Sequence, residues 1–180
     1  MATTATLSSP AARARDVLGW VFSVRSSPLP ADLGLLAARI GLAWIFIYYG
    51  GGKLFGLFNG PGIHGTSLYM SNVAHLHPGG LFAVLGGLIE FGSGCAMALG
   101  LLARLAGLAL VGDMVMAMIT VTWATGINNS TNPPGYQLNL ALAILALVVA
   151  LLGAGRFSLD AVIGQRLAAP RSAQEGNGGG

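Results

Sequence analysis

Four apolar runs of roughly membrane-spanning length constrain this chain more than any other feature. They cover residues 33–53, 80–99, 105–125 and 136–153. A helix needs about 20 apolar residues to cross the hydrocarbon core of a bilayer, and each run approaches that length. Leu, Ala and Ile dominate the runs without regular polar alternation, so the runs favour helices over the strands of a membrane barrel.

The composition agrees with a membrane protein. Hydrophobic residues make up 54% of the 180 residues and charged residues only 8%, whereas about 25% of a soluble domain is charged. A separate soluble catalytic domain would not fit beside the four runs. The net charge of +3 forms no basic stripe, so we expect no nucleic-acid partner. The predicted fold is an all-α integral membrane four-helix bundle with antiparallel helices.

Three regions follow from this reading of the chain. Residues 1–32 form a cytoplasmic N-terminal arm, residues 33–160 the four-helix domain, and residues 161–180 a disordered cytoplasmic tail. The arm has no long apolar core followed by a small-residue cleavage site, which argues against a secretory signal peptide. Residues 15–25 are compatible with a short interfacial helix that turns Trp20 and Phe22 toward lipid headgroups, and equally with a flexible arm.

The placement of arginine predicts the orientation in the membrane. Arginines precede the first run, occupy the turn between the second and third runs, and follow the fourth run: Arg13, Arg15, Arg25, Arg104, Arg156, Arg166 and Arg171. The other two connections hold only Lys53. By the positive-inside rule, both termini and the turn at residues 100–104 are expected in the cytoplasm.

Three ionisable residues fall inside the apolar runs. At about 1.5 Å of rise per residue, Arg39, Glu90 and Asp113 come to similar depths on three different helices. A lone charge at bilayer depth costs at least about 2.5–3.5 kcal/mol, and the planar guanidinium group can bridge two carboxylates. We therefore expect Arg39 to pair with Glu90, Asp113 or both. Such a cluster is compatible with a structural staple and with a polar cavity that binds a ligand or relays protons.

The connection between the first two runs, about 26 residues long, predicts a ligand pocket on the outer side. Long loops in compact domains are often functional, and this one holds all three histidines and the turn at residues 60–62. Within it, Thr66 is expected to cap a short helix that ends near His75. The expected pocket has Lys53, Tyr49 and Trp123 at its mouth, His64 and the turn as its lid, and Glu90 as its floor. The alternative is an interfacial belt of aromatic residues and lysine around a bundle cap.

The remaining reactive side chains predict little chemistry. His75 and His77 have no nearby carboxylate or cysteine in sequence, so we expect no metal site. Cys95 is the only cysteine, which excludes an internal disulfide and a CxxC redox pair. No catalytic residue can be assigned from the sequence.

Several blocks together resemble a known family. They are "ARIGLAWIFIYYGGGKLFG", "FNGPGIHGTSLYM", "GGLIEFGSGCAMALGLLARLAGLAL" and "GRFSLD". From about Leu35 to Asp160 the chain resembles the DoxX family of small four-helix membrane proteins. The most specific parts are the stretch from Arg39 to Gly56 and the glycine-rich run around Glu90.

The resemblance implies a redox association at the plasma (inner) membrane of a bacterium. Relatives are described as membrane subunits of a thiosulfate:quinone oxidoreductase, or as membrane partners of thiol-handling enzymes and superoxide dismutase. It implies no intrinsic cofactor, a quinone as candidate ligand, and soluble redox enzymes or a second copy of the chain as candidate partners. Three functions stay open: a redox-associated subunit, a non-catalytic anchor for soluble enzymes, and a proton-linked transporter or lipid-headgroup binder.

Overall fold

The computed structural model describes residues 17–22, 28–128, 130 and 134–168, and no β-strand occurs in these ranges. The main helices are α2 (Leu29–Phe55), α3 (Gly62–Asn72), α4 (Gly79–Leu99), α5 (Ala103–Ala117), α6 (Gln137–Leu152) and α7 (Leu159–Ala168). Short elements join them: the 3₁₀ turns η1 (Leu57–Asn59) and η3 (Trp123–Thr125), and the π-helix η2 (Met118–Thr122). The all-α prediction is confirmed for the described part of the chain.

Three helical stretches in the described ranges are long and apolar enough to cross a membrane: Leu29–Phe55, Gly79–Leu99 and Ala103–Thr125. The fourth apolar run forms α6, which has 16 residues and is shorter than the other three. Large apolar side chains cover the outside of the molecule, and that of Trp44 is 77% exposed. An apolar exterior of this kind suits contact with lipid, where apolar side chains meet lipid tails rather than water.

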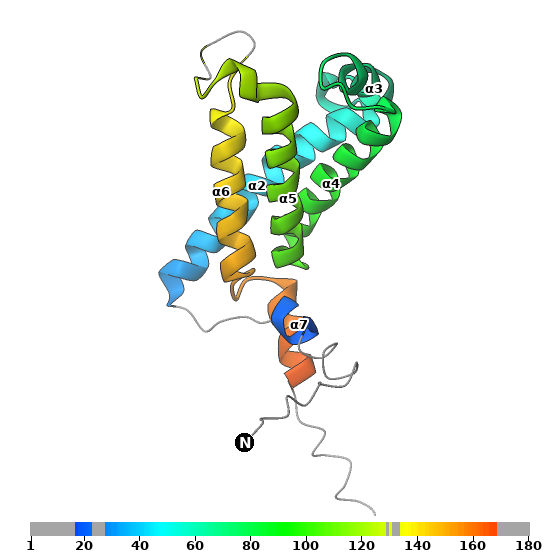
Figure 1. Ribbon diagram of the computed structural model, residues 1–180. Coiled ribbons are helices and arrows are strands. Elements are labelled where there is room, and N and C mark those ends of the chain that lie inside the picture. Colours follow the sequence, from blue (N-terminus) through cyan, green and yellow to red (C-terminus); the bar gives the residue numbers. More distant parts are fainter. Residues whose placement is uncertain (1–16, 23–27, 129, 131–133, 169–180) are drawn as a thin grey trace, which may run out of the picture.

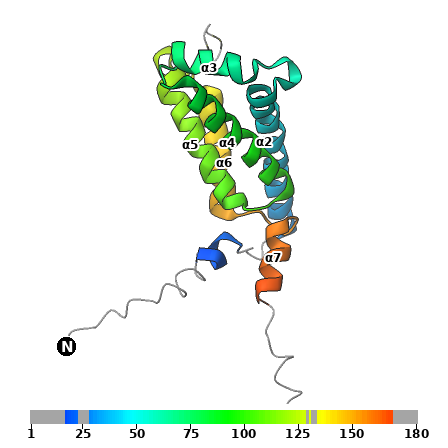
Figure 2. The ribbon, with the colours of Figure 1, turned by 90° about the vertical axis from the view of Figure 1, so that its right-hand side faces the viewer.

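The helices pack in an order that brings the first and the last described segments to the same end of the molecule. Helix α2 packs against α4, α4 against α5, and α5 against α6, while α2 runs obliquely across the group (Figure 1). Helix α3 lies across one end of this bundle, and both α7 and residues 17–21 lie at the opposite end (Figure 2). We call these the α3 end and the α7 end.

Small residues let α2 and α4 approach closely, as is common where helices pack in membranes. A Cβ atom added to Gly50 would lie 2.4 Å from the backbone nitrogen of Phe91, and one added to Gly94 would lie 2.9 Å from that of Ile47. Neither position has room for a side chain. This contact fixes the register between α2 and α4, and with it the relative positions of their polar residues.

Charged side chains join the segments at the α7 end. Both carboxylate oxygens of Asp160 accept hydrogen bonds from the backbone at the start of α5, from Leu102 N at 2.7 Å and Ala103 N at 3.0 Å. The guanidinium of Arg104 donates to carbonyl oxygens in the last turn of α6, at 2.6 Å for that of Leu151. Arg156 pairs with buried Asp32 at 2.7 Å. The contacts of Asp160 and Arg104 satisfy helix-terminal backbone groups that lack a partner within their own helix.

Two predictions need correction. The tail is helical, not disordered, between residues 161 and 168, because α7 continues to Ala168; residues 169–180 lie outside the described ranges. Thr66 does not cap a helix, because α3 begins at Gly62 and Thr66 lies one turn inside it. Of the predicted interfacial segment 15–25, residues 17–21 are helical, and residues 15, 16 and 23–25 lie outside the described ranges.

Candidate functional site

A cavity of about 860 Å³, open on one side, lies toward the α3 end and is lined by residues of α2, α3, α4, α5, η2 and α6. Its lining is largely apolar and includes four aromatic and three methionine side chains: Phe46, Tyr49, Tyr69, Phe82, Met70, Met114 and Met116. Ligand pockets for drug-sized molecules have volumes of about 300–1,000 Å³ and combine such walls with a few polar groups. The cavity is therefore large enough for a small amphiphilic molecule.

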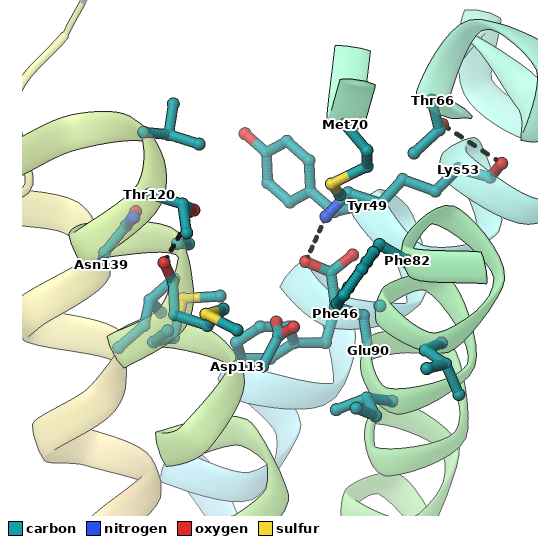
Figure 3. Close-up of a pocket in the computed structure, with 18 of the residues that line it drawn as sticks. Phe46, Tyr49, Lys53, Thr66, Met70, Phe82, Glu90, Asp113, Thr120 and Asn139 are labelled. Atoms are coloured by element: carbon teal, nitrogen blue, oxygen red, sulfur yellow. Dashed lines mark hydrogen bonds and ion pairs between the residues drawn. The ribbon is translucent and has the colours of Figure 1, made fainter. Parts of the chain in front are cut away.

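The polar part of the cavity is a charged cluster, formed by Lys53, Glu90 and Asp113 (Figure 3). The ammonium of Lys53 lies 2.6 Å from Oε1 of Glu90, and the Lys53 side chain stays 27% exposed while that of Glu90 is 4% exposed. Asp113 interacts electrostatically with both of them. With all three groups ionised, the cluster carries one net negative charge. A pocket of this kind favours a ligand that brings a positive charge or a proton to it.

Helix geometry explains why Lys53 reaches Glu90. Lys53 lies in the last turn of α2, near the α3 end, and side chains on a helix lean toward its N-terminus. The Lys53 side chain therefore points back into the bundle, where the close contact of α2 with α4 places Glu90. The ion pair is partly buried, and its desolvation offsets much of the Coulombic attraction. The pair positions charge in the cavity more than it stabilises the fold.

Helix α3 forms one wall of the cavity and is hydrogen-bonded to the end of α2. The hydroxyl oxygen of buried Thr66 lies 2.7 Å from the carbonyl oxygen of Gly62 and 3.4 Å from that of Lys53 (Figure 3). Pro61 of the predicted lid turn lines the cavity. The turn fits against α2 because its glycine has no side chain: a Cβ atom on Gly60 would lie 2.4 Å from the Cα atom of Gly52.

The α5 wall of the cavity departs from regular α-helix. The π-helix Met118–Thr122 follows α5, and Thr120, Val121 and Thr122 line the cavity there. The hydroxyl of Thr120 donates to the carbonyl of Met116 at 2.8 Å. Single π-helical turns inside longer helices are rare and occur frequently at functional sites. Here the widened turn places three polar or β-branched residues on the wall above Asp113.

The predicted pairing of Arg39 with Glu90 or Asp113 is wrong. Arg39 is 1% exposed, and its guanidinium donates to carbonyl oxygens at the α7 end: Met97 at 3.0 Å, Ala154 at 2.6 Å, Phe157 at 2.9 Å and Ala98 at 3.4 Å. The reason is again the lean of side chains toward the helix N-terminus, which carries Arg39 away from the cluster. Arg39 is a structural residue and does not line the cavity.

The other predicted pocket residues separate into two groups. Tyr49, Lys53, Glu90 and Asp113 line the cavity, whereas His64 and Trp123 do not. His64 is exposed on α3, and Trp123 is 65% exposed and stacks on Tyr136 at 5.4 Å between ring centroids. No group of three His, Cys, Asp or Glu side chains in the described ranges could hold a metal ion.

Sequence reasoning missed two parts of the wall. Tyr69 and Met70 reach the cavity from α3, and Asn139 reaches it from α6. Asn139 left a signal, because Gln137 and Asn139 are amides within the otherwise apolar start of the fourth run. The α3 residues left none beyond the length of their loop.

Comparisons with known proteins agree with the resemblance seen in the sequence. The chain is 29% identical to the inner membrane protein YqjF of Escherichia coli (strain K12) over 137 residues, which cover 75% of this chain and 95% of that protein. No solved structure is significantly similar to the chain. The DoxX family model matches residues 34–123, which include most of α2 and all of α3, α4, α5 and η2. The chain therefore belongs to the DoxX family.

Proposed function

We propose that this protein is the membrane subunit or membrane partner of a redox system, and that its cavity binds a quinone. The observation that carries the proposal is the cavity itself, which joins apolar, aromatic walls to a charged cluster inside the bundle. A quinone has the matching chemistry, because its ring and tail are apolar and its polar oxygens sit on the ring. A soluble redox enzyme at the membrane and a second copy of the chain are the proposed partners.

The residues present fit a quinone. The partly exposed ammonium of Lys53 donates hydrogen bonds, and aromatic side chains such as Phe46 and Tyr49 offer surfaces for ring packing. When bound, a quinone would supply two-electron, two-proton redox chemistry. The chain's own residues would bind and orient the ring, exclude water with their apolar walls, and hold a proton at the carboxyls of Glu90 and Asp113. Cys95 is the only cysteine, so disulfide exchange would require a thiol from a partner or a ligand.

Binding of a short-chain quinone analogue to the detergent-purified protein tests the proposal. We expect Lys53→Ala and Glu90→Gln to weaken binding. The double variant Lys53→Met, Glu90→Gln removes both charges and leaves no unpaired partner, so it separates lost binding from lost folding. Gly92→Ala on α4 is the control, because an added Cβ there meets no atom within 4 Å. Unchanged affinity in all the charge variants, with unchanged unfolding, would contradict the proposed site.

We also propose that α6 spans the membrane as a fourth helix and that both termini face the cytoplasm of the inner membrane. The arginines of the described ranges support this orientation, because Arg39, Arg104 and Arg156 make their contacts at the α7 end and Arg166 lies on α7. Reporter fusions at Ser71, Gly100 and the C-terminus test it. A periplasmic signal at Gly100 or at the C-terminus would refute the orientation.

Proton-linked transport is a second candidate, favoured by one observation. Glu90 and Asp113 place two carboxyl groups beside one lysine in the cavity, and intramembrane carboxyls of this kind occur in proton relays. In proteoliposomes, ligand addition would then move protons in the wild type and not in Glu90→Gln. Quinone binding without proton movement would reject transport and retain the first proposal.

A further inference from the structure

The charges of the cluster balance only with one more positive charge than Lys53 supplies. Among the described residues that line the cavity, Lys53, Glu90 and Asp113 are the charged ones. Two carboxylates and one ammonium leave one negative charge over. An uncompensated charge at bilayer depth is costly, so the cavity must hold a further positive charge beside the carboxyl groups.

In the empty cavity, a proton supplies this charge. Oε1 of Glu90 accepts from Lys53 at 2.6 Å, whereas Oε2 of Glu90 and Oδ2 of Asp113 are buried and meet no other donor among the described residues. The carboxyl groups of Glu90 and Asp113 are hydrogen-bonded to each other. Two carboxylates can only accept, so this bond requires a proton on one of them. One shared proton satisfies both groups and makes the cluster neutral.

The side chain of Asp113 adjoins open space in the cavity. Glu90 is engaged by Lys53, so the shared proton balances the charge that Asp113 would otherwise carry. Gly86 of α4 lines the cavity beside it. A Cβ atom added to Gly86 would lie 4.0 Å both from Oδ1 of Asp113 and from Cε of Met70. A ligand atom therefore has room next to this carboxyl group, which projects from α5 while Lys53 projects from α2 (Figure 3).

The walls of the cavity suit a cation with an apolar body. Four aromatic rings line it, those of Phe46, Tyr49, Tyr69 and Phe82, and aromatic faces attract organic cations. The two phenols are uncharged near neutral pH, and the described lining residues of η2 and α6 carry no titratable side chain. A metal ion such as Ca²⁺ needs six to eight oxygen ligands, which this largely apolar lining does not offer.

From this arrangement we propose that the cavity binds a lipophilic organic monocation in exchange for the proton shared by Glu90 and Asp113. Before the exchange, the proton and the Lys53 ammonium balance the two carboxylates. After it, the ligand takes the place of the proton, which passes to the solution, and the site stays neutral. The proposal does not depend on quinone binding. It adds a ligand class to the same cavity, and it would supply the substrate of the proton-linked candidate.

Titration of tetraphenylphosphonium into the detergent-purified full chain tests the exchange. We expect about one proton to be released per cation bound, read with a pH indicator in weakly buffered solution. Affinity should rise about ten-fold per pH unit while the pair keeps its proton. Tetraphenylborate, an anion of the same shape, should bind at least about ten-fold more weakly. Equal binding of the anion, or cation binding without proton release at every pH at which the protein stays folded, would overturn the proposal.

Two variants locate the exchange in the cavity. In Asp113→Asn, Lys53 alone balances Glu90, so both tight cation binding and proton release should be lost. Gly86→Val keeps every charge and places carbon atoms in the space beside Asp113, so it should weaken cation binding at least about ten-fold. Gly92→Ala, where an added Cβ meets no atom within 4 Å, should keep both. Unchanged affinity in Asp113→Asn or Gly86→Val, with unchanged unfolding, would place the cation elsewhere and overturn the proposal.

A short-chain quinone analogue, titrated into the same proteins, separates this proposal from the proposed function. Lys53→Met removes the donor that a quinone needs but leaves two carboxyl groups without their ammonium, so quinone binding should weaken and cation binding should strengthen. Weakening of both would overturn the charge balance argued here. If the quinone binds and the cation does not, the exchange is overturned while the proposed function stands. If the cation binds with proton release and the quinone does not bind, the proposed function fails and the exchange stands.

Discussion

The two ends of the molecule treat their charged residues in opposite ways. At the α7 end, Arg39, Arg104 and Asp160 donate to or accept from backbone groups that helix ends leave without partners. At the α3 end, one buried oxygen of Glu90 and one of Asp113 meet no hydrogen-bond donor among the described residues and lie beside a large cavity. The first arrangement stabilises the fold. The second leaves binding capacity unused, which is expected of a site that trades stability for function.

The largest expected effect is at Arg39. Arg39→Ala removes the donors for four carbonyl oxygens of the α7 end, and hydrogen bonds to charged groups contribute about 1.5–3 kcal/mol each. We expect the free energy of unfolding to fall by at least about 3 kcal/mol, measured by SDS-induced unfolding in mixed micelles. Arg166→Ala, at an exposed position of α7, is the control. If Arg39→Ala were as stable as Arg166→Ala, the charged residues of the α7 end would not stabilise the fold, and the two ends would not differ in this respect.

Gly50 lies where α2 contacts α4, and its substitution should have the next largest effect on the free energy of unfolding. In Gly50→Ala, the new Cβ atom would lie 2.4 Å from the backbone nitrogen of Phe91, so α2 and α4 must separate, at a cost of about 1–3 kcal/mol. Because the same contact positions Lys53 against Glu90, ligand affinity should fall as well. The matched control is Gly41→Ala on the same helix, where no atom lies within 4 Å. A Gly50→Ala protein as stable as Gly41→Ala would show that this contact is not needed.

A matched pair of acid-to-amide substitutions tests the comparison directly. Asp160→Asn loses one of the two acceptors for Leu102 N and Ala103 N, and we expect it to lower the free energy of unfolding by about 1–2 kcal/mol. Asp113→Asn removes surplus charge from the cavity, and we expect stability to stay unchanged or to rise. Both are measured by the same unfolding assay. If Asp113→Asn lowered the free energy of unfolding and Asp160→Asn did not, the charged cluster would stabilise the fold and Asp160 at the α7 end would not.

The smallest expected effect concerns Trp20. The guanidinium carbon of Arg104 lies 5.2 Å from the centre of the Trp20 ring, and cation–π contacts at exposed sites contribute about 0.5–1 kcal/mol. Trp20→Ala should lower the unfolding free energy by that amount. Trp20→Phe, which keeps an aromatic face, should recover part of it. If Trp20→Ala and Trp20→Phe had the same free energy of unfolding, the aromatic face would contribute nothing to stability at the α7 end.

The sequence was sufficient to predict the positions of the helices, but it was not sufficient to predict the hydrogen-bond partners of their charged residues. Long apolar runs predicted α2, α4, α6 and the continuous stretch of α5, η2 and η3 to within a few residues, because hydrophobic length is a local property. The acceptors of Arg39 are backbone carbonyls 58 to 118 residues away along the chain, and every residue type carries such a carbonyl. An estimate of depth along the helix axis also takes no account of the lean of long side chains toward the helix N-terminus. This lean moves the Arg39 guanidinium away from Glu90, and it moves the Lys53 ammonium toward Glu90.

The cavity was predicted in part for a similar reason. Lys53, Tyr49 and Glu90 stood out because charge and aromatic residues are rare in apolar runs, and all three line the cavity. His64 was chosen because it lies in a long loop, but α3 is a helix with two faces, and His64 is on the exposed one. Which face a short helix turns inward depends on its contacts with α2 and α4, and these are not encoded in its own eleven residues.

The unequal lengths of α2 and α6 have a consequence for the surrounding lipid. At about 1.5 Å per residue, α2 with 27 residues extends about 40 Å and α6 with 16 residues about 24 Å. In the proposed four-span topology, the hydrocarbon layer, about 30 Å thick, must thin beside α6, while the oblique path of α2 accommodates its excess length. The protein should therefore prefer thin membranes. A higher unfolding midpoint in vesicles of shorter acyl chains would record that preference.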